Sequence, residues 1–306
     1  MAGPDRDLQE SLDGLETEAW NADGADLDLR STDELVELMN AQDLTVPVAV
    51  AAAGPAIAAA IDEIAARLRN GGRLIYVGAG TSGRLAELDA AECEATFSAR
   101  PGQVTALLAG GTGGSPLEQE VAEDDAAAGE RELEALDVSA ADAVVAISAS
   151  GRTPYVVGAL SAAAAAGALT VCLVSVRDSE LARIARHEIA VPVGAEILTG
   201  STRLKAGTSQ KLVLNMISTI SMIRIGKTFG NLMVDVYPAN EKLEARVRRI
   251  VQLATGAPPE RVDEALGAAG GDAKVAIVSL IAGVDAETAR ARLAAADGGV
   301  RGALEP

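Results

Sequence analysis

The chain has 306 residues, of which 49% are hydrophobic and 2% aromatic. This length supports one main domain with a small accessory domain, built mostly from Ala, Val, Leu and Ile. The formal net charge of −18 repels nucleic acid phosphates and anionic membranes, so neither is expected as a partner, and an anionic substrate needs a local positive site.

The N-terminal part is predicted to be an extended arm followed by helices. Residues 1–30 are polar and acidic, and no signal peptide is visible at their start. A capping box at Ser31 and Glu34 opens a helix that runs through Met39. A second helix spans about Thr45–Arg69 and ends at two glycines; its prolines and charges argue against a membrane span.

Strand and helix patterns then alternate. The predicted strands are Leu74–Val77, Val104–Leu108, Ala143–Ile147, Leu169–Val174 and Ile189–Val193. The predicted helices between them are Ser82–Thr96, a helix from a capping box at Ser115 and Glu118 to about Leu136, and a helix capped by Thr153 and Pro154 that runs to Ala166. Five short apolar strands separated by helices predict an α/β fold with a parallel, doubly wound sheet.

The last part of the chain is predicted to be helical. A long helix covers 203–225, another covers 239–254, and short helices follow at Pro259–Ala268, Ala273–Ala282 and Ala286–Ala295. We therefore expect an N-terminal arm and helix (1–45), an α/β domain (46–230), a connecting helix (231–256) and a small C-terminal helical subdomain (257–306).

Two loops rich in Gly, Ser and Thr each follow a strand and open a helix, at residues 76–84 and 148–155. Free backbone N–H groups and the helix dipole make such loops anion sites. Ser148, Ser150 and Thr153 lie on one tight turn and could wrap the terminal oxygens of a sugar phosphate, with Ser82 completing the cradle. Helix capping by Thr153 is the simpler alternative and does not exclude binding.

The first loop also matches the dinucleotide fingerprint G-x-G-x-x-G over residues 78–83. That fingerprint requires an acid after the second strand to bind the ribose, and here the strand runs into Ala109, Gly110 and Gly111. The hydroxyl groups suit a phosphate monoester better, so a dinucleotide cofactor is not expected.

Cysteine and histidine usage argues against a metal site. Cys93 and Cys172 lack metal-like spacing, which fits a reducing cytoplasm. His187 is the only histidine, and we expect it to be a surface or packing residue.

These loops resemble those of sugar isomerase (SIS) domains, which bind phosphosugars. The segment 194–211 resembles a signature shared by N-acetylmuramic acid 6-phosphate etherases and the glucokinase regulatory protein. Further stretches that resemble the etherases are 15–18, 38–40, 89–93, 230–235 and 240–243, and the likeness covers about residues 10–305. Glu94 and Ala95 depart from the family, which usually has two prolines there.

The resemblance implies cleavage of a D-lactyl ether through the open-chain aldehyde of the sugar, with a pair of carboxyl groups and no metal or redox cofactor. It assigns Glu92 as proton donor to the lactate oxygen and Glu123 as base at C2. Taken alone, both residues would be solvated helix glutamates.

Glu92 lies ten positions after Ser82, about 15 Å along an ideal helix, which is long for one sugar phosphate. Either the helix breaks early, or Glu92 serves the site of a neighbouring subunit. SIS-type proteins commonly pair with substrate at the interface, so the resemblance favours a homodimer with shared sites. The apolar helices at 31–69 and 203–225 are its expected surfaces.

Further candidates for substrate binding are Thr81, Gly83, Arg84, Glu196, Arg203 and Lys205. Arg203, Lys205 and Lys211 would supply a positive field, or else pair with Glu196 or other acids. Glu196 itself is either an ion-pair partner or a ligand of a sugar hydroxyl.

Two other functions compete. A non-catalytic phosphosugar-binding regulator would share segment 194–211, but that class resembles a tandem of two such domains and would not need both glutamates. An aldose–ketose phosphate isomerase would need a base at C2 but would not explain that segment. Fold alone does not separate these functions.

Overall fold

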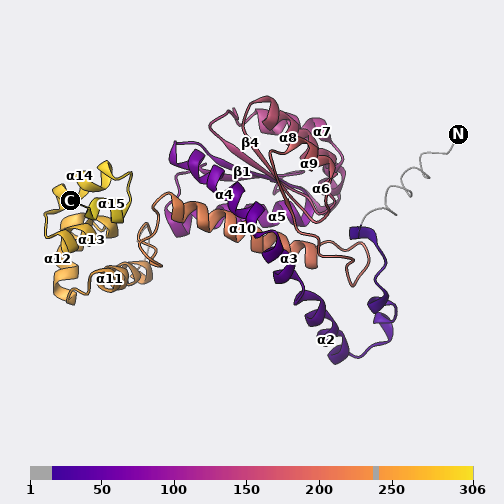
Figure 1. Ribbon diagram of the computed structural model, residues 1–306, viewed down its shortest axis with the longest axis horizontal. Coiled ribbons are helices and arrows are strands. Elements are labelled where there is room, and N and C mark those ends of the chain that lie inside the picture. The colour runs from indigo at the N-terminus through magenta and orange to yellow at the C-terminus, as the bar shows by residue number, and fades with distance from the viewer. Residues whose placement is uncertain (1–15, 237–240, 306) are drawn as a thin grey trace. The chain divides into compact units, whose positions relative to one another are not determined.

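A computed structural model describes residues 16–236 and 241–305 of the chain (Figure 1). The chain divides into two compact units. The first combines residues up to Ala90 with Thr105–Ile217, and the second combines Ala91–Val104 with the residues from Ser218 onward. The four-part division expected from the sequence stays a prediction.

A five-stranded sheet forms the centre of the first unit, in the order β2-β1-β3-β4-β5. The strands are β1 (Leu74–Gly78), β2 (Val104–Leu108), β3 (Ala143–Ile147), β4 (Leu169–Val174) and β5 (His187–Ala190). β1 pairs with β3, β3 with β4, and β4 with β5, all in parallel; Leu74 lies opposite Ala143, which lies opposite Leu169. The predicted doubly wound α/β fold is therefore confirmed.

The strand order explains where a ligand would bind. The chain moves from β1 outward to β2, then crosses back to place β3 on the other side of β1. Ligands of doubly wound sheets bind at such a switch point, beyond the carboxyl ends of the strands. The two Ser/Thr-rich loops follow β1 and β3, the strands that flank this point.

Apolar side chains fill both faces of the central strands. All residues of β1, β3 and β4 are buried. α7 (Ala126–Glu134) and α8 (Pro154–Ala165) pack closely, because a Cβ atom on Gly129 would lie 2.0 Å from the carbonyl oxygen of Tyr155. Their side chains and those of the sheet form one core cluster.

Two helices expected to be continuous are broken, so these predictions were wrong. The helix predicted over 45–69 is two helices, α3 (Val46–Ala52) and α4 (Gly54–Arg69), because Pro55 cannot donate a backbone hydrogen bond. The helix predicted to reach Leu136 ends as α6 (Pro116–Glu123), and α7 begins after Asp125, which accepts a hydrogen bond from the Ala128 amide.

The helix predicted after Ser31 is confirmed, whereas the described part of the predicted extended arm contains three short turns. Short 3₁₀ turns at Glu16–Glu18, Ala22–Gly24 and Leu27–Leu29 precede α2 (Thr32–Asp43). The capping boxes at Ser31 and Ser115 are both present. Residues 1–15 of the predicted arm lie outside the described residues.

Three more helices complete the α/β part. α5 (Gly80–Phe97) continues through Glu92 without a break, so the early break considered above is wrong. α10 covers Lys205–Arg224 and matches the predicted long helix. A short helix that the sequence did not predict, α9 (Glu180–Ile184), follows β4.

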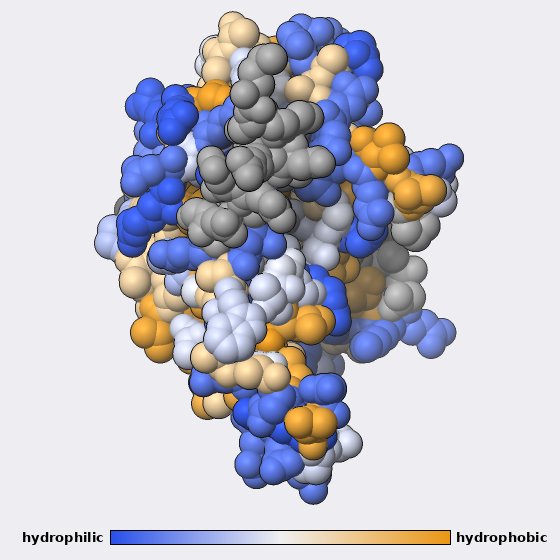
Figure 2. Space-filling view, turned by 90° about the vertical axis from the view of Figure 1, so that its right-hand side faces the viewer, coloured by the Kyte–Doolittle hydropathy of each residue, from blue (hydrophilic) through white to orange (hydrophobic). Residues whose placement is uncertain are grey.

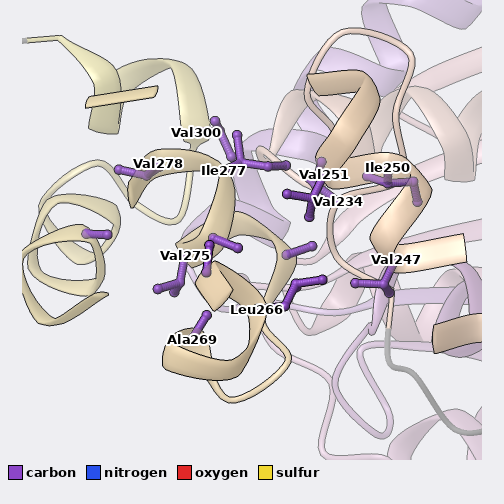
Figure 3. Packing of buried hydrophobic residues seen from close by; sticks show 14 of the residues in the cluster. Val234, Val247, Ile250, Val251, Leu266, Ala269, Val275, Ile277, Val278 and Val300 are labelled. Carbon is purple, nitrogen blue, oxygen red and sulfur yellow. The ribbon is translucent and has the colours of Figure 1, made fainter. Parts of the chain in front are cut away.

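The second unit has its own apolar core (Figure 3). Its helices are α11 (Glu241–Thr255), α12 (Pro259–Ala269), α13 (Ala273–Ala282), α14 (Ala286–Ala295) and α15 (Val300–Leu304). Gly270 and Gly283 adopt positive φ angles of 67° and 66° at the ends of α12 and α13, as C-capping requires. The C-terminal helical region is confirmed; residues 239 and 240 of the predicted helix lie outside the described residues.

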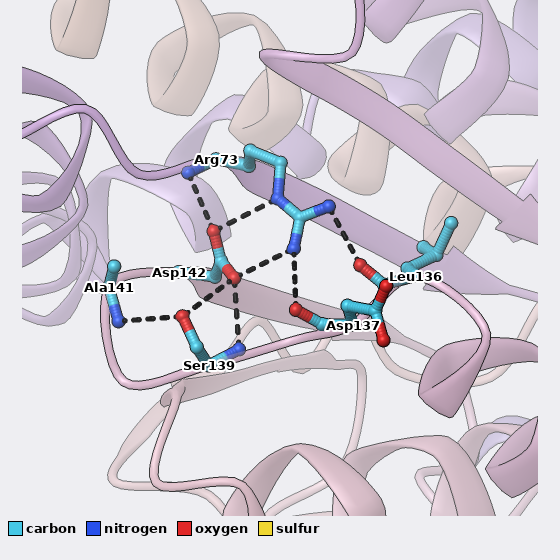
Figure 4. A network of polar contacts seen from close by, with 6 residues as sticks. All are labelled: Arg73, Leu136, Asp137, Ser139, Ala141 and Asp142. Carbon is cyan, nitrogen blue, oxygen red and sulfur yellow. Dashed lines mark hydrogen bonds and ion pairs between the residues drawn. The ribbon is translucent and has the colours of Figure 1, made fainter.

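A polar network joins the beginnings of β1 and β3 (Figure 4). Arg73 Nη2 lies 2.9 Å from Asp142 Oδ2, and Arg73 Nη1 donates to the Leu136 carbonyl oxygen at 2.8 Å. Burial favours a higher pKa for Asp142, but hydrogen bonds from Arg73 and Ser139 outweigh it, so the pKa lies below its ordinary value.

Hydrophilic residues cover much of the face seen in Figure 2, with hydrophobic residues among them. Within the described ranges, no single helix has the length and apolar composition of a membrane span; one bent pair, Thr32–Ala52 with Gly54–Arg69, meets that test together.

Candidate functional site

A polar cavity of about 230 Å³ lies at the carboxyl ends of β1 and β3, at the switch point of the sheet. The four predicted phosphate ligands line it, Ser82, Ser148, Ser150 and Thr153, together with Thr81, a further candidate for substrate binding. Glu123 lines the same cavity from the end of α6. The fold thus brings one predicted catalytic glutamate to the predicted phosphate loops.

Hydroxyl groups of the second loop contact one another. Ser148 Oγ lies 2.9 Å from Thr153 Oγ1 and 3.4 Å from Ser150 Oγ, and it accepts a hydrogen bond from the Gly151 amide at 3.1 Å. Gly151 has a φ of +66°, which a residue with a side chain rarely adopts. The turn therefore holds its hydroxyl groups close together beside backbone N–H groups.

Thr153 does not cap α8, contrary to the expectation above. It occupies the N-cap position, but its side chain makes no capping hydrogen bond. Instead, Thr153 Oγ1 donates to Glu123 Oε1 at 3.2 Å. The loop thus holds a carboxylate next to the phosphate cradle.

The environment of Glu123 raises the pKa of its carboxyl group and so makes the carboxylate a stronger base. Burial raises the pKa of Glu123 above its ordinary value, the hydrogen bond from Thr153 lowers it in part, and the nearby Asp124 and Glu120 charges raise it further. A carboxylate base works best when its pKa approaches the working pH.

The first loop is held by packing and by α10. Ser82 Oγ donates to Gln210 Oε1 at 2.9 Å. A Cβ atom on Gly83 would lie 2.7 Å from the Gly78 carbonyl oxygen, so Gly83 allows α5 to begin directly against β1. Arg84 Nη2 donates to Gln119 Oε1 at 2.7 Å and is not among the residues that line the cavity.

Glu196 caps α10. Its carboxylate accepts hydrogen bonds from the backbone amides of Lys205 at 3.1 Å and Ala206 at 2.9 Å, and the residue is 1% exposed. Lys205 Nζ donates to Gln42 Oε1 at 2.9 Å, while Arg203 is exposed. None of Glu196, Arg203 and Lys205 lines the cavity.

Lys211 pairs with an acid, which is one of the two alternatives left open by the sequence. Its Nζ lies 3.9 Å from Asp89 Oδ1. Asp89 is buried and also accepts a hydrogen bond from the Tyr76 hydroxyl at 3.0 Å. Lys211 therefore stabilises a buried carboxylate between β1, α5 and α10.

Glu92 belongs to the second unit and is exposed on α5. The helix continues through Glu94 and Ala95, where the etherases usually have prolines, and ends at Phe97.

Glu18 and Thr202 also line the cavity and were missed as site residues. Both lie in segments, 15–18 and 194–211, that carry the family resemblance. That resemblance was the only signal for them, because neither residue is near the two loops in the sequence.

The remaining candidates have packing roles. His187 Nε2 lies 3.0 Å from Glu63 Oε1, and Cys93 and Cys172 are buried and are not joined in a disulfide. Among the side chains of 16–236 and 241–305, no group of three or more His, Cys, Asp and Glu is arranged to hold a metal ion.

Comparisons with known proteins identify the domain and the fold. Residues 56–164 match the family described as the glucokinase regulatory protein N-terminal SIS domain, and residues 122–220 match the SIS domain. A phosphoheptose isomerase from Francisella tularensis has a similar fold, with a TM-score of 0.50 and 19% identity; the match covers 63% of this chain and 100% of that chain.

Much closer relatives are N-acetylmuramic acid 6-phosphate etherases. The protein of that name from Rubrobacter xylanophilus is 56% identical over 297 residues, covering 97% of this chain and 98% of that one. The one from Streptomyces coelicolor is 55% identical over 298 residues, covering 97% of this chain and 96% of that one.

Proposed function

The chain belongs to the family of N-acetylmuramic acid 6-phosphate etherases, and we propose that it performs this reaction with Glu123 as base and Glu92 as acid. It is a carbon–oxygen lyase that cleaves the D-lactyl ether of N-acetylmuramic acid 6-phosphate. The products are N-acetylglucosamine 6-phosphate and D-lactate, and the reaction serves the recycling of cell-wall amino sugars. A cytoplasmic location is part of this proposal.

The substrate phosphate binds in the cavity at the switch point. Ser82, Ser148, Ser150 and Thr153 supply hydroxyl groups, and the loop after β3 supplies backbone N–H groups at the beginning of α8. Hydroxyl and amide donors bind a phosphate monoester without a lysine or arginine. The contact between Glu123 and Thr153 then places the carboxylate next to the bound sugar phosphate.

Proton removal at C2 begins the elimination. In the open-chain sugar, the C1 aldehyde acidifies the C2–H bond, and the Glu123 carboxylate takes that proton to leave an enolate. The raised pKa of Glu123 makes its carboxylate a stronger base than an exposed glutamate.

Loss of lactate and addition of water complete the reaction. The enolate electrons form the C2–C3 double bond while the C3–O bond breaks, and Glu92 donates its proton to the departing lactate oxygen. Water then adds at C3, the proton returns to C2, and the ring closes to N-acetylglucosamine 6-phosphate. The substrate, one water molecule and the two carboxyl groups account for all atoms and protons, so the reaction needs no other reactant.

A homodimer with shared sites reconciles the position of Glu92 with this role. α5 is unbroken from the phosphate loop to Phe97, so Glu92 of one subunit would act on the substrate held by its partner. Exposed apolar side chains support an interface at the N-terminal helices: α2 buries none of its residues, and Leu44 and Val48 are 75% and 71% exposed.

The etherase function is favoured over a phosphosugar-binding regulator and over an isomerase. Its nearly full-length relatives at more than half identity carry the etherase name. The polar cavity that joins both loops to Glu123 is the structural observation that carries the proposal.

The direct test is release of D-lactate from N-acetylmuramic acid 6-phosphate. Wild-type protein should release lactate, and Glu92→Gln and Glu123→Gln should each lose at least about a hundredfold in rate, as expected for acid–base catalysts. Glu120→Gln, an exposed neighbour on α6, serves as the control and should retain most of the rate. Tight sugar-phosphate binding without lactate release would instead indicate a regulator.

A further inference from the structure

A second cavity of about 540 Å³ lies beside the phosphate cavity in the same unit. The two cavities share Ser150 as a lining residue. Three arginines line the second one: Arg152 from the phosphate loop, and Arg177 and Arg183 from the segment around α9. Three acidic residues, Glu16, Asp178 and Glu180, line it as well, so charges of both signs meet there.

The wall of this cavity is fixed to the phosphate loop. The Ser175 amide donates to the Ala149 carbonyl oxygen at 3.0 Å, and the Leu181 amide donates to the Gly151 carbonyl oxygen at 3.1 Å. A Cβ atom on Gly151 would lie 2.4 Å from the Cβ atom of Ser179, so the two segments are in close contact. The segment 175–183 and the phosphate loop therefore form one continuous, tightly packed surface.

The charges of the two cavities differ. Glu18 and Glu123 line the phosphate cavity, and no lysine or arginine from 16–236 or 241–305 does. The hydroxyl and amide donors of that cavity serve the phosphate, so the carboxylate of the substrate would have no guanidinium or ammonium partner there. The second cavity offers a nearby place for such a group.

Arg177 and Arg183 are free to bind a carboxylate. Glu16, Asp178 and Glu180 also line this cavity, but no ion pair or hydrogen bond joins the guanidinium groups of Arg177 and Arg183 to another residue in the described part of the chain. A guanidinium group matches the geometry of a carboxylate and binds it through charge-assisted hydrogen bonds.

We propose that this arginine-lined cavity binds the carboxylate of the substrate's lactyl group, with Arg177 and Arg183 as its ligands. The proposal rests on the etherase function, since the substrate then carries two anionic groups, a phosphate and a carboxylate. The phosphate loop holds the first group, and the arginines hold the second. The cavity thereby distinguishes the ether substrate from the product N-acetylglucosamine 6-phosphate, which lacks the carboxylate.

Kinetics of Arg177→Gln and Arg183→Gln test this inference. Each variant should raise the KM for N-acetylmuramic acid 6-phosphate about tenfold or more, as expected for a lost charge-assisted hydrogen bond. The inhibition constant of N-acetylglucosamine 6-phosphate should change less than about twofold, because this ligand has no group to reach the arginines. Arg131→Gln, an exposed arginine on α7 of the same unit, is the matched control and should change neither value.

These experiments distinguish a failure of the carboxylate site from a failure of the etherase function. An unchanged KM in both variants, with lactate still released, would overturn the carboxylate site and leave the etherase function intact. An equal loss of affinity for both ligands would also overturn it, because the arginines would then act on the shared phosphate. Absence of lactate release by the wild-type protein would contradict the function itself.

Discussion

The side chain of Thr153 makes contacts that its local sequence does not predict. A threonine before a proline at the beginning of a helix predicts a cap, yet its hydroxyl group contacts Ser148 and Glu123 instead. The sequence could predict the hydroxyl cluster, because Ser148, Ser150 and Thr153 share one turn. It could not predict the contact with Glu123, because 30 positions separate the two residues.

Replacing Thr153 with Val should shift the pH profile of kcat/KM. Burial raises the pKa of Glu123 and the Thr153 hydrogen bond lowers it in part. Removing that bond should therefore raise the pKa further. Since the base must be ionised, activity falls as the pH drops through this pKa, and the acid limb should move to higher pH.

The control for this shift is Ser150→Ala, which alters the same phosphate loop without touching the Glu123 hydrogen bond. Its acid limb should stay at the wild-type position even where its KM rises. If the acid limb of Thr153→Val lies at the wild-type pH or below it, this hydrogen bond does not lower the pKa of Glu123.

At the scale of elements, the strands were predicted from apolar runs and the helix ends from periodicity. The strand predictions were the more accurate of the two. β2, β3 and β4 match their predicted bounds, because each is a short run of mostly apolar residues. The breaks at Ala53 and Asp124 were missed, because alanine-rich patterns continue across them. The order of the strands was not predictable, since it depends on which side of β1 each crossover takes.

The Arg73–Asp142 network should stabilise the pairing of β1 with β3. Asp142→Asn removes a buried charge that accepts hydrogen bonds from Arg73 and Ser139, so it should lower the free energy of unfolding by about 2 kcal/mol at pH 7. Because folding lowers the pKa of Asp142, this contribution is present above the unfolded value of 3.8 and is lost as the pH falls through the lower folded value.

Thermal unfolding at several pH values measures this difference. The gap between wild type and Asp142→Asn should narrow as the pH falls below 3.8. Asp28→Asn, an exposed aspartate in the first unit, should leave stability nearly unchanged. A gap that stays constant down to low pH would contradict the role of the ionised Asp142.

At the scale of the whole molecule, the proposed homodimer determines which groups meet at one substrate. Sequence resemblance indicated the pair of glutamates, and the fold places Glu123 beside the phosphate loops. The proposed pairing of Glu92 with a neighbouring subunit is supported by the unbroken α5 and by the exposed apolar residues of the N-terminal helices. The ten positions between Ser82 and Glu92 already suggested this pairing at the level of the sequence, but they left an early helix break as the alternative, which only the unbroken α5 removes.

Mixing two inactive variants tests the shared site. If Glu92 serves the partner, co-expression of Glu92→Gln and Glu123→Gln chains should restore about one quarter of wild-type activity, because half of the dimers are mixed and each holds one intact site. Glu123→Gln co-expressed with itself is the control and should stay inactive. No recovery in a dimer shown to contain both chains would place the two glutamates in one subunit.

Exchange of the C2 proton in D₂O tests the central division of roles most directly. Glu92→Gln should exchange the C2 proton of N-acetylmuramic acid 6-phosphate for deuterium without releasing lactate, because the base is intact and the acid is missing. Glu123→Gln should show neither exchange nor lactate release. Exchange by Glu123→Gln, together with its loss in Glu92→Gln, would contradict the account and reverse the two roles.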